Sequence, residues 1–293
     1  MRRIKYIIIL IVLNAVFPIG LKALIVPQTA EMISLSSAGI AGNVDIGVNP
    51  ASIVQDTSSV SFSSNEWLGG LLGSKVSYTK SINNSHHYFS FEYLGIDDIE
   101  LRDEQPSDLP LGYVKSNWIA FDYANNIQNK YNIDMGYKFK LNYSKLYTER
   151  YYGYSFDFGL KKNINKYIDL GFVVKNVGVE YKGNESIPID YMAGFGIAFN
   201  YPVEKNYFKG INVFLDGLTQ KDLDIIRIGM KINFPYVSLL LGTSYSDGYG
   251  DIAYGLSFKY NNFELAIGNL NHENPILGSP ASLQFKYHIN KIN

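Results

Sequence analysis

Residues that could carry out chemistry are few and widely separated in this chain of 293 residues. The chain has no cysteine, and its four histidines are His86, His87, His272 and His288. No His-Glu-x-x-His, Gly-x-Ser-x-Gly or P-loop pattern occurs in the sequence. His288 could point from a strand towards a serine, but nothing places a base and an orienting carboxylate beside it. We therefore expect no catalytic residue, no metal site and no cofactor, and so a protein that is not an enzyme.

Charged side chains follow a regular pattern, because they recur on one face of several alternating segments. These positions are Asp134, Lys138, Lys140, Asp157, Lys161, Asp190, Arg227, Lys231 and Lys259. Since alternate residues of a strand point to the same side, we expect all nine on the less hydrophobic face of a sheet. They could line a passage, or they could pair with one another. The paired network is favoured, because buried charges need partners.

Alternation of apolar and small or polar residues is the strongest pattern in the sequence. Between residues 189 and 201, one face carries Ile, Tyr, Ala and Phe, and the other carries Asp, Met, Gly, Ala and Asn. Residues 131–142 and 251–260 show the same division. A soluble sandwich also alternates, but its strands are typically about 5 to 6 residues long and its outer face is charged. Longer segments with aromatic ends are typical of a transmembrane β-barrel, whose apolar face meets lipid.

Fourteen such segments can be counted between residues 57 and 290, an even number as in bacterial barrels. The count takes Gly95 as a bend within one strand at residues 86–101, and it takes residues 187–201 as one strand. Four pairs are predicted as turns, Asn83-Asn84, Asn125-Asn126, Asp247-Gly248 and Asn261-Asn262, and residues 102–112 are predicted as a surface loop. The predicted fold is therefore all-β, a 14-stranded transmembrane antiparallel β-barrel.

The N-terminal region divides into two parts before the barrel. Residues 1–23 combine Arg2, Arg3 and Lys5 with a short apolar run, as a secretory signal peptide does. Residues 24–56 then precede the first strand of the barrel, which would span residues 57–293. Within residues 24–56, Asn49, Pro50 and Ala51 predict a rigid corner, because proline fixes its own φ and restricts the residue before it. An ordinary turn leading into the first strand is the alternative.

Two stretches resemble the FadL-like outer-membrane barrels. In "SLSSAGIAGNVDIGVNPASIV", at 34–54, the matching positions are Ser36, Ser37, Gly39, Gly42, Asp45, Gly47, Asn49, Pro50 and Ala51. In that superfamily this pattern belongs to a plug or hatch packed in the lumen, so the resemblance implies that residues 24–56 form a plug inside the barrel. The stretches "FVVKNVGVEYKGNESIPIDYMAGFGIAF", at 172–199, and "FEYLGIDDIELRDE", at 91–104, resemble the PorV/PorQ branch, which serves type IX secretion.

The resemblance implies an outer-membrane protein that supports protein secretion or surface attachment. Its partners would be the lipid bilayer of the outer membrane and other secretion-system or exported proteins. A FadL-like channel for hydrophobic small molecules is the alternative function, and a purely structural barrel is a third. The net charge of -1 gives no indication of nucleic-acid binding.

Overall fold

The computed structural model describes residues 24, 26–52, 58–67, 70–82, 85–101, 109–128, 132–146, 148–273 and 279–289. The proposed signal peptide at 1–23 and most of the proposed loop at 102–112 lie outside these residues. No helix in these ranges is both long enough and apolar enough to cross a membrane.

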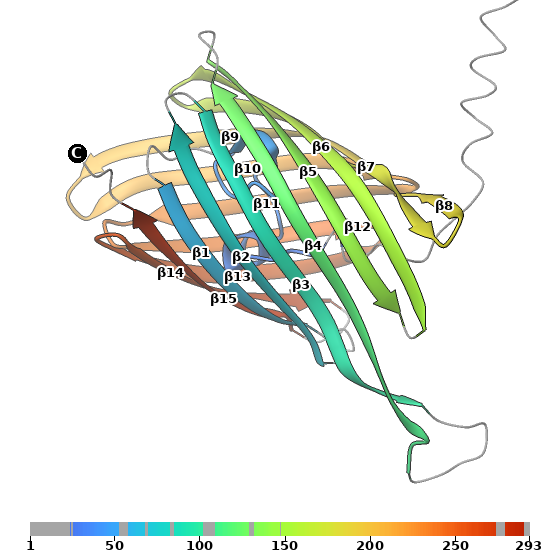
Figure 1. Ribbon diagram of the computed structural model, residues 1–293. Coiled ribbons are helices and arrows are strands. Elements are labelled where there is room, and N and C mark those ends of the chain that lie inside the picture. Colours follow the sequence, from blue (N-terminus) through green and yellow to red (C-terminus); the bar gives the residue numbers. More distant parts are fainter. Residues whose placement is uncertain are drawn as a thin grey trace, which may run out of the picture.

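Fourteen long strands form a closed antiparallel barrel, as the alternation predicted (Figure 1). Each long strand pairs with its neighbours in the chain, and β1 pairs with the last strand, β15, which closes the sheet. The strands are β1 (Ser58–Trp67), β2 (Leu71–Ile82), β3 (Ser85–Leu101), β4 (Gly112–Gln128), β5 (Ile133–Leu146), β6 (Glu149–Asn165), β7 (Ile168–Lys182), β8 (Glu185–Pro188), β9 (Met192–Lys205), β10 (Phe208–Gln220), β11 (Leu223–Asn233), β12 (Val237–Ser246), β13 (Tyr249–Tyr260), β14 (Phe263–His272) and β15 (Ala281–Ile289). The short strand β8 is not one of the fourteen, because it pairs with β7 alone.

Gly95 lies within a continuous strand, as predicted. It pairs with Leu72 on one side and Asn117 on the other, and the register of β3 and β4 shifts just beyond it, between Ile96 and Ile99. Glycine permits such an irregularity without breaking the strand. The count of fourteen barrel strands is therefore correct.

The expectation of one strand at 187–201 was wrong. Strand β8 ends at Pro188 and β9 begins at Met192, so three residues between them lie outside any strand. Gly183, with φ +59, reverses the chain so that β8 folds back on β7. Pro188 cannot donate a backbone hydrogen bond and therefore stands where the short strand stops.

Of the four predicted turns, Asp247-Gly248 and Asn261-Asn262 are present, Asn125-Asn126 is not, and Asn83-Asn84 lies outside the described residues. Asp247 and Gly248 both have positive φ, 47° and 79°, and they join β12 to β13 as a tight hairpin. Asn125 and Asn126, in contrast, lie within β4 and are buried. The Asn126 amide donates to the carbonyl oxygen of Ala51 at 2.6 Å, so this asparagine serves the barrel interior and not a turn.

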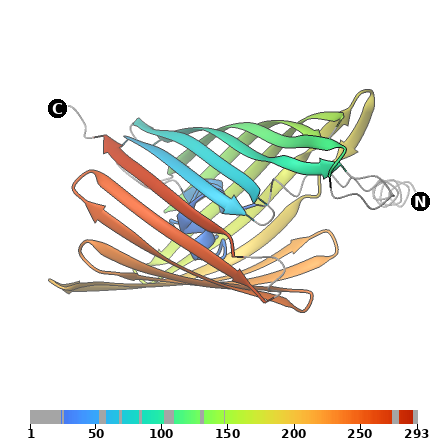
Figure 2. The ribbon, with the colours of Figure 1, turned by 90° about the horizontal axis from the view of Figure 1, so that it is seen from below.

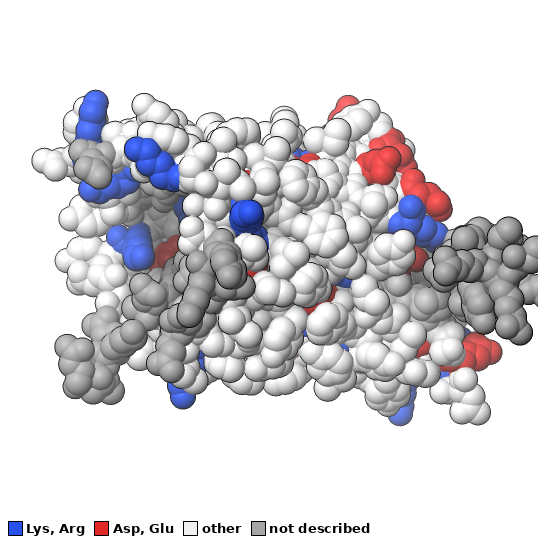
Figure 3. Space-filling model, turned by 90° about the horizontal axis from the view of Figure 1, so that it is seen from above, with Lys and Arg blue, Asp and Glu red and all other residues white. Residues whose placement is uncertain are grey.

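The two faces of the sheet meet different environments. Large apolar side chains such as Phe195, Phe258 and Leu283 point outward and are 43–51% exposed. Figure 3 shows few charged residues over the middle of the face that it presents, and most of the charged residues lie towards the two ends. Such a distribution matches the hydrocarbon layer of a bilayer.

Residues 26–52, which precede β1 in the chain, lie inside the barrel (Figure 2). We call residues 26–52 the luminal segment; it contains the short helix α2 (Ala30–Ser34) and the 3-10 turn η2 (Pro50–Ser52). Helix α2 packs against β12 to β15, and η2 packs against β4 to β6 on the other side. We call the end where β1 begins and β15 ends the near end, and the opposite end the far end.

Candidate functional site

Glycines in the barrel wall leave room for the backbone of the luminal segment. Gly136 and Gly159 are paired across β5 and β6, and a Cβ at either one would overlap Pro50 or Asn49. On the opposite wall, a Cβ at Gly242 would overlap the backbone of Leu35. The segment is therefore seated against both walls at close range, and side chains larger than hydrogen cannot replace these glycines without displacing it.

The Asn49-Pro50-Ala51 corner is fully buried. The Asn49 amide donates to the carbonyl oxygens of Ile40, Leu160 and Phe172 at 2.7, 3.3 and 3.4 Å. Its side-chain oxygen accepts the backbone N–H of Ala51 at 2.9 Å. One asparagine thus joins two parts of the luminal segment to two barrel strands, and we propose that this corner is structural.

Ion pairs join lumen-facing side chains of nearby strands in one part of the barrel wall. Lys140 binds Glu92 at 2.6 Å and Asp122 at 3.5 Å, and Lys75 binds the other oxygen of Glu92 at 3.0 Å. Lys138 binds Asp157 at 2.8 Å. All of these side chains are less than 8% exposed. Three lysines and three carboxylates therefore compensate one another inside the wall of β2 to β6.

Other predicted charges contact the luminal segment. Lys231 binds Glu31 at 2.5 Å, and the Arg227 guanidinium donates to the carbonyl oxygen of Ser37 at 3.4 Å. Lys161 lies 3.5 Å from Asp134 and also donates to Asn43.

Two of the nine predicted positions lie elsewhere. Asp190 is exposed in the connection between β8 and β9, 3.8 Å from Lys221, because the chain leaves the sheet there. Lys259 is exposed close to the near end of β13. The interior network of the described residues therefore includes seven of the nine.

Sequence reasoning missed several interior charges on strands whose faces were not divided. Lys75, Glu92 and Asp122 belong to the ion-pair group above, and Lys175 donates to the carbonyl oxygen of Gly47. Asp216 accepts the backbone N–H groups of Gly39 and Ile40. The period of two in β2 and β10 would have placed Lys75 and Asp216 inside, but nothing local indicates what they bind.

The environment of His288 does not form a nucleophilic site. Its Nε2 atom lies 3.3 Å from Glu264, and the Ser257 hydroxyl donates to the other oxygen of that carboxylate at 3.1 Å. The serine therefore contacts the carboxylate and not the imidazole base that would activate it. Among the described residues, no cluster of His, Asp and Glu is arranged to hold a metal ion.

An apolar cluster lies inside the barrel towards the far end, and we call it the vestibule cluster. It consists of Leu24, Leu94, Trp118, Ala120 and Ile189, with Val26, Trp67 and Leu71 packed against them. The five strand residues Leu94, Trp118, Ala120, Trp67 and Leu71 form its wall. Leu24 and Val26, at the start of the described chain, cover it from within.

A groove of about 750 Å³ lies in the wall close to the vestibule cluster, and we call it the outer groove. Its apolar lining includes the outward-facing Leu72, Leu239, Leu241, Tyr254, Ile267 and Leu283. Leu72 on the outer face follows Leu71 of the vestibule cluster directly in the chain. The cluster and the groove therefore lie on opposite faces of the β1–β2 hairpin.

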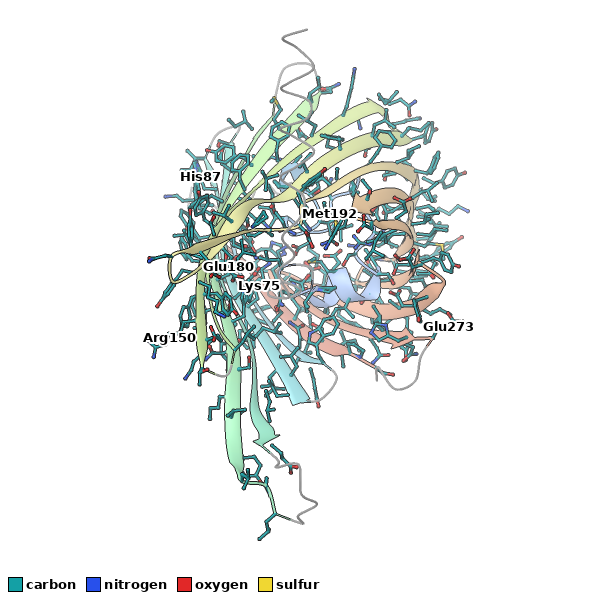
Figure 4. All side chains as sticks on the ribbon, turned by 90° about the vertical axis from the view of Figure 1, so that its right-hand side faces the viewer. Lys75, His87, Arg150, Glu180, Met192 and Glu273 are labelled. Carbon is teal, nitrogen blue, oxygen red and sulfur yellow. The ribbon has the colours of Figure 1, made fainter. Side chains whose placement is uncertain are left out.

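Two small cavities lie in the lumen of the described barrel. A central cavity of about 30 Å³ lies among the ion pairs, and a hydroxyl-rich space of about 90 Å³ lies beside β1 and β2. Figure 4 looks into the barrel and shows Lys75 and Met192, which both line the central cavity, towards its middle. The luminal segment and the ion pairs thus occupy the middle of the barrel among the described residues.

Comparisons with known proteins identify the fold. No protein-family model and no curated protein matches the sequence. Among solved structures, the toluene transporter TodX of Pseudomonas putida matches with a TM-score of 0.61 and 10% identity, covering 89% of this chain and 97% of TodX. The toluene transporter TbuX of Ralstonia pickettii matches at 0.58 and 8%, covering 89% and 98%. The monoaromatic hydrocarbon channel CymD matches at 0.64 and 8%, covering 91% and 98%.

These similarities show that the chain has the fold of the FadL-like outer-membrane barrels. The likeness covers 89–91% of this chain. At such low identities it concerns the fold, and it does not reach the narrower PorV/PorQ branch.

Proposed function

We propose that this protein is an outer-membrane channel for small hydrophobic molecules. The vestibule cluster supports this most directly, because it is an apolar cluster inside the barrel that lies towards the far end. Binding sites for small molecules are typically apolar and concave. The named structural neighbours, which are transporters and channels for toluene and monoaromatic hydrocarbons, give the proposal its substrate class.

The far end would face the outside of the cell. Connections at the near end are short, for example Asn165 to Ile168 and Tyr260 to Phe263, whereas Leu101 to Gly112 and His272 to Ala281 at the far end are longer. Outer-membrane barrels place short turns in the periplasm and long loops outside. A hydrophobic molecule would then meet the vestibule cluster before the ion-paired centre.

The route past the centre would lead sideways through the wall. Bringing an apolar molecule through the axis would require the separation of buried ion pairs such as Lys138–Asp157, which costs several kcal/mol, about 3 to 5 for one broken pair. The outer groove offers apolar surface on the other face of the β1–β2 hairpin. Passage from the vestibule cluster to this groove, and from there to lipid, avoids the charged centre.

A pair of matched variants tests the role of the vestibule cluster. Ile189→Asp places a carboxylate among apolar side chains, whereas Tyr191→Asp makes the same change two residues away, where the side chain is 59% exposed. We expect Ile189→Asp to lower uptake of radiolabelled toluene by whole cells at least about tenfold, since a buried unpaired charge excludes apolar ligands. Tyr191→Asp should leave uptake unchanged. Equal uptake by the two folded variants would contradict the proposal.

Protein secretion of the PorV/PorQ type is a second proposal, and one observation favours it. The β3–β4 hairpin extends beyond the rest of the far end (Figure 1), and its Leu111 and Tyr113 are 74% and 62% exposed. Exposed apolar side chains on a protruding element are suited to a protein partner. A deletion strain separates the two functions: loss of surface display with normal toluene uptake supports secretion, and the reverse result supports the channel.

A further inference from the structure

The central cavity has a positively charged wall. Lys75, Lys138, Lys140, Lys175 and Arg227 line it, and Glu92 is the one carboxylate in the lining. They come from five barrel strands, β2, β3, β5, β7 and β11, that surround the luminal segment. Five basic groups therefore converge on a space that one acidic group shares.

Three of the five basic groups already have carboxylate partners. Lys75 and Lys140 bind Glu92, Lys140 also binds Asp122, and Lys138 binds Asp157. These pairs compensate charge in the wall behind the cavity. Lys175 and Arg227 are the two remaining basic groups of the cavity lining, and their hydrogen-bond partners are of a different kind.

Lys175 and Arg227 bind carbonyl oxygens of the luminal segment. Lys175 donates to Gly47, and Arg227 donates to Ser37. An ammonium has three N–H donors and a guanidinium has five, so most of their donors have no protein acceptor among the described residues. Both side chains are partly buried and line the central cavity, so an acceptor placed there can meet the donors that the protein leaves unused.

The acidic groups nearest to these two cations are engaged elsewhere. Asp157, which faces Lys175, binds Lys138 and the backbone N–H of Asn176. Asp216 accepts two backbone N–H groups of the luminal segment, as described above. Asp251, the other acid acting on Arg227, accepts hydrogen bonds from Ser36 and Ser244.

We propose that the central cavity binds a small monovalent anion of halide size. The cavity of about 30 Å³ exceeds the roughly 10–15 Å³ that one water needs, but it is too small for a bulky polyatomic or organic anion. An anion there accepts hydrogen bonds from Lys175 and Arg227 together and links β7 and β11 to the luminal segment. It is a structural counter-ion that holds the luminal segment in the barrel, and this role is independent of the molecule that the channel carries.

Bromide quenching of Trp118 fluorescence tests the proposal directly. The Trp118 ring is 4% exposed, and the Nζ atom of Lys140, which lines the cavity, lies 5.0 Å from its centroid. The chain has two tryptophans, so a Trp67→Phe background leaves Trp118 as the one indole. We expect purified protein in detergent to show saturable quenching by bromide. Chloride should compete, and sulfate at equal ionic strength should not.

Two lysine variants provide the matched comparison. Lys175→Met should weaken the saturable bromide effect at least about tenfold, because it removes a charge-assisted donor from the cavity. Lys259→Met removes the same charge from an exposed site on β13 and should leave bromide binding unchanged. Purely collisional quenching in the unaltered protein, or equal bromide affinity in both variants, would overturn the proposal. The titration of the unaltered protein decides the question even if Lys175→Met does not fold.

Discussion

At the scale of single residues, the direction of each side chain decides what a substitution costs. Phe195 on β9 is 49% exposed on the outer face, whereas its neighbour Ala198 is fully buried beside Leu35 and Phe214 of the interior. The same strand thus presents one face to hydrocarbon and the other to a packed interior. Lumen-facing positions next to the luminal segment are therefore as constrained as a protein core.

A charge at Phe195 tests the assignment of the outer face. Phe195→Arg should destabilise the barrel by about 2 to 4 kcal/mol, because an arginine near the bilayer midplane loses its hydration. The measurement is urea unfolding of protein refolded into lipid vesicles, with Phe195→Leu as the control that keeps the side chain apolar. Equal stability of the two variants would mean that Phe195 does not face lipid.

At the scale of elements, the luminal segment and the barrel wall fit each other through glycines and one asparagine. The segment has little regular structure of its own, since α2 has five residues and η2 has three. Its backbone groups instead bond to side chains of the wall, such as Asp216 and Asn126. Its conformation therefore depends on the barrel that surrounds it.

Alanine substitution at two glycines tests how closely the segment fits. Gly136→Ala places a methyl group against the backbone of Pro50, whereas Gly217→Ala on β10 meets no atom within 4 Å. We expect Gly136→Ala to cost about 1 to 3 kcal/mol, as overpacking does, and to expose the luminal segment to added protease. Gly217→Ala should leave both stability and proteolysis unchanged. If the luminal segment stays protected from protease in Gly136→Ala, its fit against the wall at Gly136 is looser than proposed.

At the scale of the whole molecule, closure of the sheet leaves none of the fourteen barrel strands at an edge. Strands β1 and β15 pair from Ser58 with Ile289 to Glu66 with Ala281, so the first and last barrel strands close it as neighbours. A closed sheet satisfies its own backbone groups, which lipid cannot do. This closure makes unfolding by detergent slow.

The closed barrel predicts a gel-shift behaviour and a location. An unheated sample in SDS should migrate faster than a boiled one, because the compact barrel resists the detergent. The protein should also fractionate with the outer membrane of the cell. The control is the same sample unfolded in urea before loading, which should match the boiled band. Recovery as a soluble protein with one band under all conditions would contradict the membrane assignment.

The sequence alone determined the barrel, its fourteen strands and the orientation of their faces. The reason is that the alternation of side chains is a local property of a strand, so a segment of about ten residues shows it whichever strands lie beside it. Residues such as Phe258 and Lys138 could therefore be placed outside and inside before any contact was known. Glycine at position 95 could be read as a bend for the same reason.

Only the tertiary structure decided which interior groups meet. Lys140 and Glu92 are 48 residues apart, and Asp216 lies 177 residues from Gly39, so their contacts depend on strand register and on the path of the luminal segment. The exposed position of Asp190 depends likewise on β8 folding back on β7. Alternation gives the side of the sheet, but the height along the barrel and the partner across it come from how all strands close together.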